Sequence, residues 1–135
     1  MRSPIIKSAS LWLPVLAWMG VIFYFSSIPD LRSPFEWDLL YRKLAHAAEY
    51  LVLAVLSARA LRGSGLSRAA CLVLGFLIAA GYAVTDEYHQ SFVPGRTAST
   101  RDVLIDSTGA LLGALAGLFL YKAKTGNIKT ATESS

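Results

Sequence analysis

The sequence contains few charged residues and a single cysteine. Only 16% of its 135 residues are charged, whereas 54% are hydrophobic and the mean hydropathy is +0.47. A soluble domain carries about 25% charged residues, so this composition excludes a disordered chain and argues against a water-soluble globule. Cys71 alone can form neither an internal disulfide nor a metal–thiolate site. The net charge of +4 is spread between apolar runs, which argues against nucleic-acid binding.

Four long apolar runs predict an all-α integral membrane four-helix bundle. Residues 8–29 carry no charge and can cross a hydrocarbon core of about 30 Å. This run is longer and bulkier than the core of a signal peptide, so we interpret it as a retained span. The other predicted spans are 39–61, 69–88 and 103–121. Residues 1–124 then form one membrane domain, and 125–135 form a polar tail that we expect to be cytoplasmic and disordered.

The distribution of charge predicts that both termini are cytoplasmic. Eight of the 13 Lys and Arg residues fall near the termini or the connection between the second and third spans. Eight of the nine acidic residues fall toward the opposite side, so that end of the bundle is polar and mixed in charge. No internal repeat supports an inverted-repeat transporter.

The second predicted span carries ionisable residues within the membrane. Lys43, His46 and Tyr50 share one helical stripe, and Glu49 lies beside it. Glu49 is about ten residues into the span, or about 15 Å, which is near the middle of the membrane. A carboxylate there costs at least about 2.5–3.5 kcal/mol, so it should face the bundle interior. It either serves function or forms an internal ion pair that fixes packing.

Polar residues also close the third span, namely Asp86, Glu87, His89 and Gln90. Taken alone, these four residues fit an ordinary polar helix end in the headgroup region at least as well as they fit a functional site. Pro94-Gly95 then predicts a turn, and Arg96 follows it. The planar fork of Arg96 suits a carboxylate or a phosphate, although a lone loop arginine is more often a solvated charge.

The fourth span combines two carboxylates with a line of glycines. Asp102 is placed to cap this helix. One stripe continues from it through Asp106, Gly109, Gly113 and Gly117. The glycines form a surface for close helix packing, either within the chain or between two copies as a homo-oligomer. Asp106 therefore faces protein and needs a partner, for which Arg96, Lys43 and His46 are candidates.

These signals converge on one non-cytosolic end of the bundle. Its cations are Arg42, Lys43, Arg96 and Arg101, and its carboxylates are Glu49, Asp86, Glu87, Asp102 and Asp106, together with His46 and His89. Such a network can hold a divalent ion through carboxylates and imidazole. It can also hold a lipid phosphate through Arg and Lys while the acids orient a water molecule. The sequence alone does not assign a metal or cofactor.

Three segments together resemble the VanZ-like family of small bacterial membrane proteins. They are residues 43–50 (KLAHAAEY), 85–96 (TDEYHQSFVPGR) and 99–113 (STRDVLIDSTGALLG). The resemblance implies a bacterial cytoplasmic membrane protein with a cell-envelope role, because the family is named for a factor giving low-level teicoplanin resistance. Its recurring polar positions correspond to Lys43, His46, Glu49, Asp86, Glu87, Gln90, Arg96, Asp102 and Asp106. Arg42 departs from the pattern, since members often carry an acid there, which weakens a metal site that uses that acid.

Two functional hypotheses follow. In the first, the chain processes a lipid-linked or phosphate-bearing envelope precursor. The catalytic candidates are His46, Glu49, Asp86, Glu87 and Asp106, and the substrate-binding candidates are Lys43, Gln90, Arg96 and Asp102. No HExxH motif or Ser-His-Asp spacing is present, so the reaction type stays open. In the second, a non-enzymatic envelope factor binds a lipid headgroup, an antibiotic or a partner membrane protein.

Overall fold

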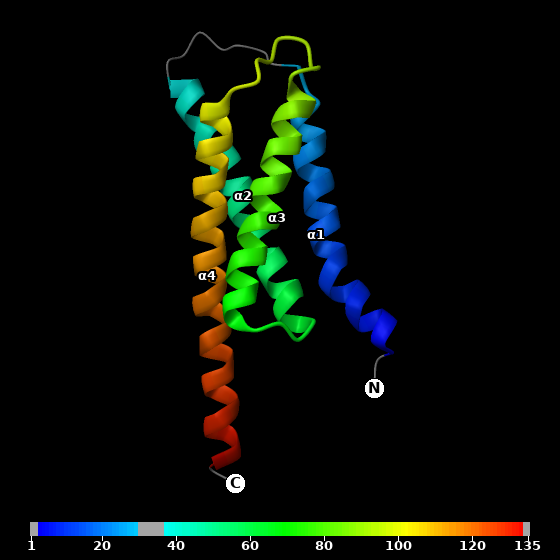
Figure 1. Ribbon diagram of the computed structural model, residues 1–135, viewed down its shortest axis with the longest axis vertical. Helices are drawn as coiled ribbons and strands as arrows, with labels where there is room; N and C mark the ends of the chain where they lie inside the picture. The colour runs from blue at the N-terminus through cyan, green and yellow to red at the C-terminus, as the bar shows by residue number, and fades with distance from the viewer. Residues whose placement is uncertain (1–2, 30–36, 134–135) are drawn as a thin grey trace.

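The computed structural model describes the backbone of residues 3–29 and 37–133, and side chains as far as residue 120. These residues form four helices: α1 (Pro4–Ser26), α2 (Trp37–Gly63), α3 (Arg68–Gln90) and α4 (Thr100–Glu133) (Figure 1). Each is long and apolar enough to cross a membrane, with the span in α4 covering Thr100–Leu120. The predicted all-α bundle is confirmed, and the chain is a multi-pass membrane protein. Asp30, Arg32 and Glu36, which we predicted on the non-cytosolic side, lie outside the described residues.

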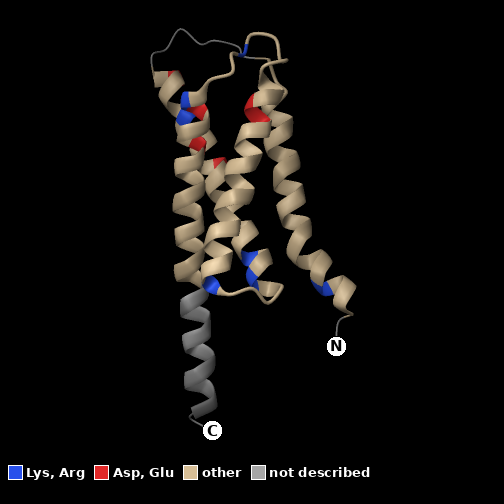
Figure 2. Cartoon of the chain, viewed as in Figure 1, with Lys and Arg blue, Asp and Glu red and all other residues tan. Residues whose placement is uncertain are grey.

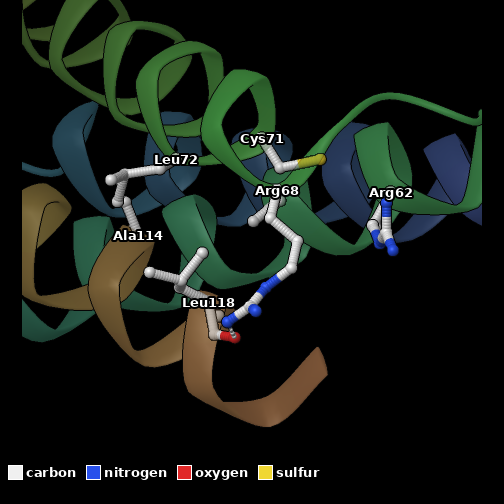
Figure 3. Close-up of a pocket in the computed structure, with 8 residues that line it drawn as sticks. Arg62, Arg68, Cys71, Leu72, Ala114 and Leu118 are labelled. Carbon is white, nitrogen blue, oxygen red and sulfur yellow. Dashed lines mark hydrogen bonds between the residues drawn. The ribbon is translucent and has the colours of Figure 1, made fainter. Parts of the chain in front are cut away.

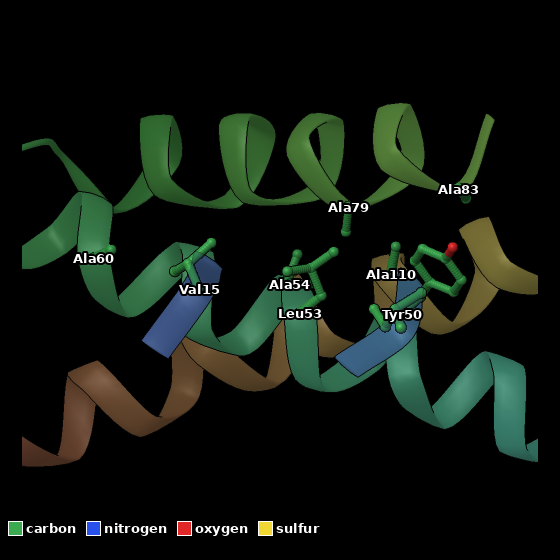
Figure 4. Packing of buried hydrophobic residues seen from close by; sticks show 10 residues of the cluster. Val15, Tyr50, Leu53, Ala54, Ala60, Ala79, Ala83 and Ala110 are labelled. Carbon is green, nitrogen blue, oxygen red and sulfur yellow. The ribbon is translucent and has the colours of Figure 1, made fainter. Parts of the chain in front are cut away.

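The helices pack around a core of small side chains. α2 contacts each of the other three helices, and α1 lies against α2 and α3 while its N-terminal part diverges from the bundle (Figure 1). Ala54 of α2, Ala79 and Ala83 of α3, and Ala110 of α4 are completely buried (Figure 4). Lipid tails supply no hydrophobic force between helices, so small residues that allow close packing favour association.

The glycine stripe of α4 makes the closest helix approach in the described chain segments, against α2. A Cβ atom at Gly109 would come within 2.8 Å of the carbonyl carbon of Ala47, and one at Gly113 would lie as close to that of Leu51. At Gly117 the nearest atom would be the Cβ of Ala58, at 3.1 Å. The predicted packing role is confirmed. This face is covered by α2 within one chain.

Two expectations about α4 are corrected. The helix begins at Thr100, three residues before the predicted start, so Asp102 lies in the first turn rather than at the cap. Its negative charge still favours the positive end of the helix dipole. The helix also continues to Glu133, where we expected a disordered tail. That stretch has no proline, and its Ala and Lys residues favour a helix, while Gly126 costs about 1 kcal/mol relative to alanine.

The loop between α3 and α4 contains the predicted turn at Pro94-Gly95. The backbone N–H of Arg96 donates to the carbonyl of Val93 at 3.2 Å, which closes the turn. Gly95 has a φ of +78°, and this conformation favours glycine at the third position of a type II turn. The turn therefore brings Arg96 back over the ends of the helices.

Candidate functional site

Charged side chains divide between the two ends of the bundle. All described acidic residues lie toward the end where α1 and α3 finish and α2 and α4 begin, hereafter the polar end (Figure 2). At the other end the described charged residues are Lys and Arg, and we call it the basic end (Figure 2). The predicted gathering of ionisable groups at one end is therefore confirmed for the described residues.

Asp86 is the centre of a buried hydrogen-bond network. It is 4% exposed, and its Oδ2 accepts the Tyr50 hydroxyl at 2.9 Å and the Gln90 amide at 3.0 Å. Gln90 also donates to the Ser26 hydroxyl at 3.1 Å, which joins α1, α2 and α3. The second oxygen, Oδ1, is buried and has no hydrogen-bond partner. Asp86 is thus held firmly in place with one oxygen unused.

Asp106 lies deeper on α4 and lacks the cation that we expected. Its side chain is 3% exposed, and Oδ1 is buried without a hydrogen-bond partner. The carboxylates near enough to repel its charge are Glu49, Asp86, Glu87 and Asp102. We expected Arg96, Lys43 or His46 to pair with it, and this is wrong because each of them has a different partner. Asp106 therefore adds a second unpartnered buried oxygen.

His46 and Glu49 form a pair one turn apart on α2. The His46 Nδ1 is 3.5 Å from the Glu49 Oε2, and that oxygen is buried without a hydrogen bond. The Glu49 side chain is 20% exposed, so it turns toward the bundle, as expected for a carboxylate in a membrane. An imidazole beside a carboxylate is a pair that can transfer a proton when a substrate reaches it.

The other charged residues near the polar end contact one another or the backbone. Lys43 Nζ lies 4.0 Å from Asp102 Oδ1, which links α2 to α4 as a loose, half-exposed pair. Glu87 is buried, and its Oε1 accepts the backbone N–H of Ser99 at 2.6 Å. Glu87 therefore anchors the end of the α3–α4 loop, and its role is at least partly structural.

Arg96 contacts backbone carbonyls, and its role in binding a carboxylate or a phosphate stays a prediction. Its Nε donates to the carbonyl of Ile28 at 2.9 Å, and its Nη2 donates to that of Phe25 at 3.1 Å. These carbonyls lie at the end of α1, where helices have unsatisfied acceptors and a partial negative charge. The sequence predicted that Arg96 makes a two-pronged contact, and in the structure this contact is with the end of α1.

Sequence reasoning missed several contacts that α1 makes with the site. Ser26 is 1% exposed and accepts the Gln90 amide, although its place in an apolar run gave little signal beyond its hydroxyl. Trp18 Nε1 donates to the Glu49 carbonyl at 2.8 Å. The rings of Phe23 and His89 stack with centroids 4.4 Å apart. These contacts link α1, which carries no acidic residue, to the polar end.

The described residues contain no group of three or more His, Cys, Asp and Glu side chains arranged to hold a metal ion. The unpartnered oxygens of Glu49, Asp86 and Asp106 instead make the interior of the polar end a set of acceptors. Acceptors of this kind suit a ligand that brings hydroxyl, amine or amide donors.

Comparison with known proteins agrees with the motifs. The family model described as VanZ/LLP1 matches residues 11–121, which include most of the first span, the other three spans and the polar end. The chain matches no curated protein and no solved structure. Because the match covers most of the sequence and the residues that build the site, the chain belongs to the VanZ/LLP1 family.

Proposed function

We propose that this protein serves the bacterial cell envelope by binding a lipid-linked component at the polar end, outside the cytoplasm. One observation carries the proposal: buried carboxylate oxygens from three helices, on Glu49, Asp86 and Asp106, have no hydrogen bond, and only that of Glu49 has a near partner, the His46 Nδ1 at 3.5 Å. Leaving a buried acceptor without a hydrogen bond is costly, and the cost is recovered when a ligand supplies donors. Family membership supports an envelope role and, more finely, reduced sensitivity to glycopeptides such as teicoplanin.

The ligand class follows from the charges around these oxygens. Hydroxyl and amine groups of a sugar or peptide headgroup would meet the carboxylates. The loosely paired Lys43 is half-exposed at the rim, where the phosphate of a lipid carrier would lie. Arg96 is a weaker candidate for that phosphate because α1 occupies two of its donors. A polyprenyl-phosphate-linked sugar combines both kinds of group and is the ligand we propose.

Asparagine and glutamine variants test binding without a large change of side-chain volume. In a teicoplanin-sensitive bacterial strain that expresses the chain, Asp86→Asn and Asp106→Asn should remove the gain in resistance at unchanged protein abundance. Binding of a purified labelled polyprenyl-diphosphate sugar should weaken about tenfold or more, because an amide donor would face the donors of the ligand. Asp38→Asn is the matched control, since Asp38 lies at the same end and pairs with Arg42 at 3.0 Å.

A second candidate function is processing of the same ligand, which the His46–Glu49 pair favours. Asp86→Glu separates the two functions. Moving a catalytic group by an ångström can cost about 100-fold in rate, whereas a binding site tolerates the longer acid better. Product formation from the labelled lipid that is lost in Asp86→Glu and His46→Ala would establish processing. Full resistance and full binding in both Asn variants would exclude a role for this end in either function.

A further inference from the structure

The basic end contains a hollow that the proposed function does not use. It is a shallow hollow between α2, α3 and α4 with a free volume of about 10 Å³, room for about one water-sized group (Figure 3). Its lining residues are Ala58, Arg62, Arg68, Cys71, Leu72, Ala114, Gly117 and Leu118. Pockets for drug-sized ligands measure about 300–1,000 Å³, so this hollow suits one polar atom of a ligand that otherwise lies on the surface.

Two arginines of this lining have donors to spare. Arg68 donates from Nη2 to the Leu118 carbonyl at 3.2 Å, while its Nε is buried with no hydrogen-bond partner (Figure 3). Arg62 donates from Nη1 to the Leu66 carbonyl at 2.9 Å. Neither arginine is in an ion pair with any described acidic residue, because those residues lie at the polar end (Figure 2). The lining therefore contains two cationic side chains without a described acidic partner.

The rest of the lining is apolar. Leu72, Ala114 and Leu118 lie beside Arg68, so the hollow presents a hydrocarbon surface next to guanidinium groups (Figure 3). Arg62 and Arg68 are half-buried, and the buried Nε of Arg68 lacks the acceptor that would satisfy it. The planar fork of arginine suits phosphate oxygens, and basic recesses between membrane helices hold anionic headgroups.

We propose that Arg62 and Arg68 form a binding site for an anionic phosphate ester at the basic end. The phosphate group would accept hydrogen bonds from the spare guanidinium donors, and a hydrocarbon chain attached to it would lie against Leu72 and Leu118. The ligand can be the headgroup of an anionic membrane lipid or a free phosphate. This site lies at the opposite end of the bundle from the carboxylates, so a test of this site is independent of a test of the proposed function.

Native mass spectrometry of the full chain, released from micelles that contain phosphatidylglycerol or phosphatidylcholine, tests the site. The wild-type chain should retain phosphatidylglycerol in preference to phosphatidylcholine. In Arg62→Gln/Arg68→Gln the retained amount should fall about tenfold or more, the effect of losing charge-assisted hydrogen bonds. Arg59→Gln is the matched control, because Arg59 is exposed on α2 near the same end and is absent from the lining.

An excess of inorganic phosphate separates the two sources of the ligand. Retention that survives the excess identifies a lipid headgroup, and complete displacement identifies a site for phosphate itself. Equal retention of the two lipids by the wild-type chain overturns the proposal, as does an equal loss in Arg59→Gln and the double variant. If the double variant does not fold, the preference of the wild-type chain between the two lipids, with and without inorganic phosphate, still tests the proposed site.

Discussion

Replacing Gly109 by alanine should destabilise the bundle at the closest approach of α4 to α2. The added Cβ would lie nearest to the carbonyl oxygen of Ala47 and 2.8 Å from its carbonyl carbon, whereas carbon atoms in contact are about 3.5–4.0 Å apart. The helices would therefore have to separate by at least about 0.7–1.2 Å. The atom in the way is backbone held in a helix, so it cannot turn aside as the end of a flexible side chain can.

Overpacking sets how much stability Gly109→Ala loses, and the higher helix propensity of alanine offsets part of that loss. Added groups in a tight core cost about 1–3 kcal/mol. Alanine is also a better helix former than glycine by about 1 kcal/mol, which acts in the opposite direction. Gly81→Ala carries the same propensity gain, and its Cβ would meet nothing within 4 Å. The difference between the two variants therefore isolates the clash, at about 1–3 kcal/mol or a factor of about 5 to 150 in the folding equilibrium.

The measurement is equilibrium unfolding of the full chain in mixed micelles with increasing dodecyl sulfate, followed by tryptophan fluorescence. Gly113→Ala should resemble Gly109→Ala, because its Cβ would lie 2.8 Å from the Leu51 carbonyl carbon. The reasoning about close approach is refuted if Gly109→Ala is no less stable than Gly81→Ala.

Three further predictions concern the polar end. Tyr50→Phe should lower stability by about 1–2 kcal/mol in the same unfolding assay, because Asp86 loses a buried hydrogen bond; wild-type stability would contradict this role. Glu87→Ala should speed hydrogen exchange at Ser99 by freeing its amide, whereas Glu87→Gln, which keeps an acceptor, should not; equal exchange in both would contradict the anchor. Arg96→Gln should weaken the attachment of α1 and accelerate proteolysis near residues 25–29, and an unchanged cleavage pattern would count against that contact.

The partners of the polar residues were harder to predict than their location. Arg96 was expected to bind an anion, yet it binds the end of α1, because the turn at Gly95 directs it there. Asp106 was expected to find a cation, yet the nearby cations have partners closer to the rim. Spacing along one helix gives the face of a residue, but it does not give the depth and rotation of the neighbouring helices.

Much of the architecture was determined by the sequence. Long uncharged runs have few alternatives to crossing the membrane as helices, because backbone groups in lipid must be satisfied within the segment. The glycine spacing on α4 fixed a close-packed face, and the positions of the acids fixed a polar end. The partner of each polar atom was decided by the tertiary structure. Only packing shows that α2 covers the glycines and that Ser26 completes the Asp86 network, leaving oxygens of Glu49, Asp86 and Asp106 without donors. Hydrogen bonds act over about 3 Å, so a helix rotation or shift smaller than one turn changes which groups can meet.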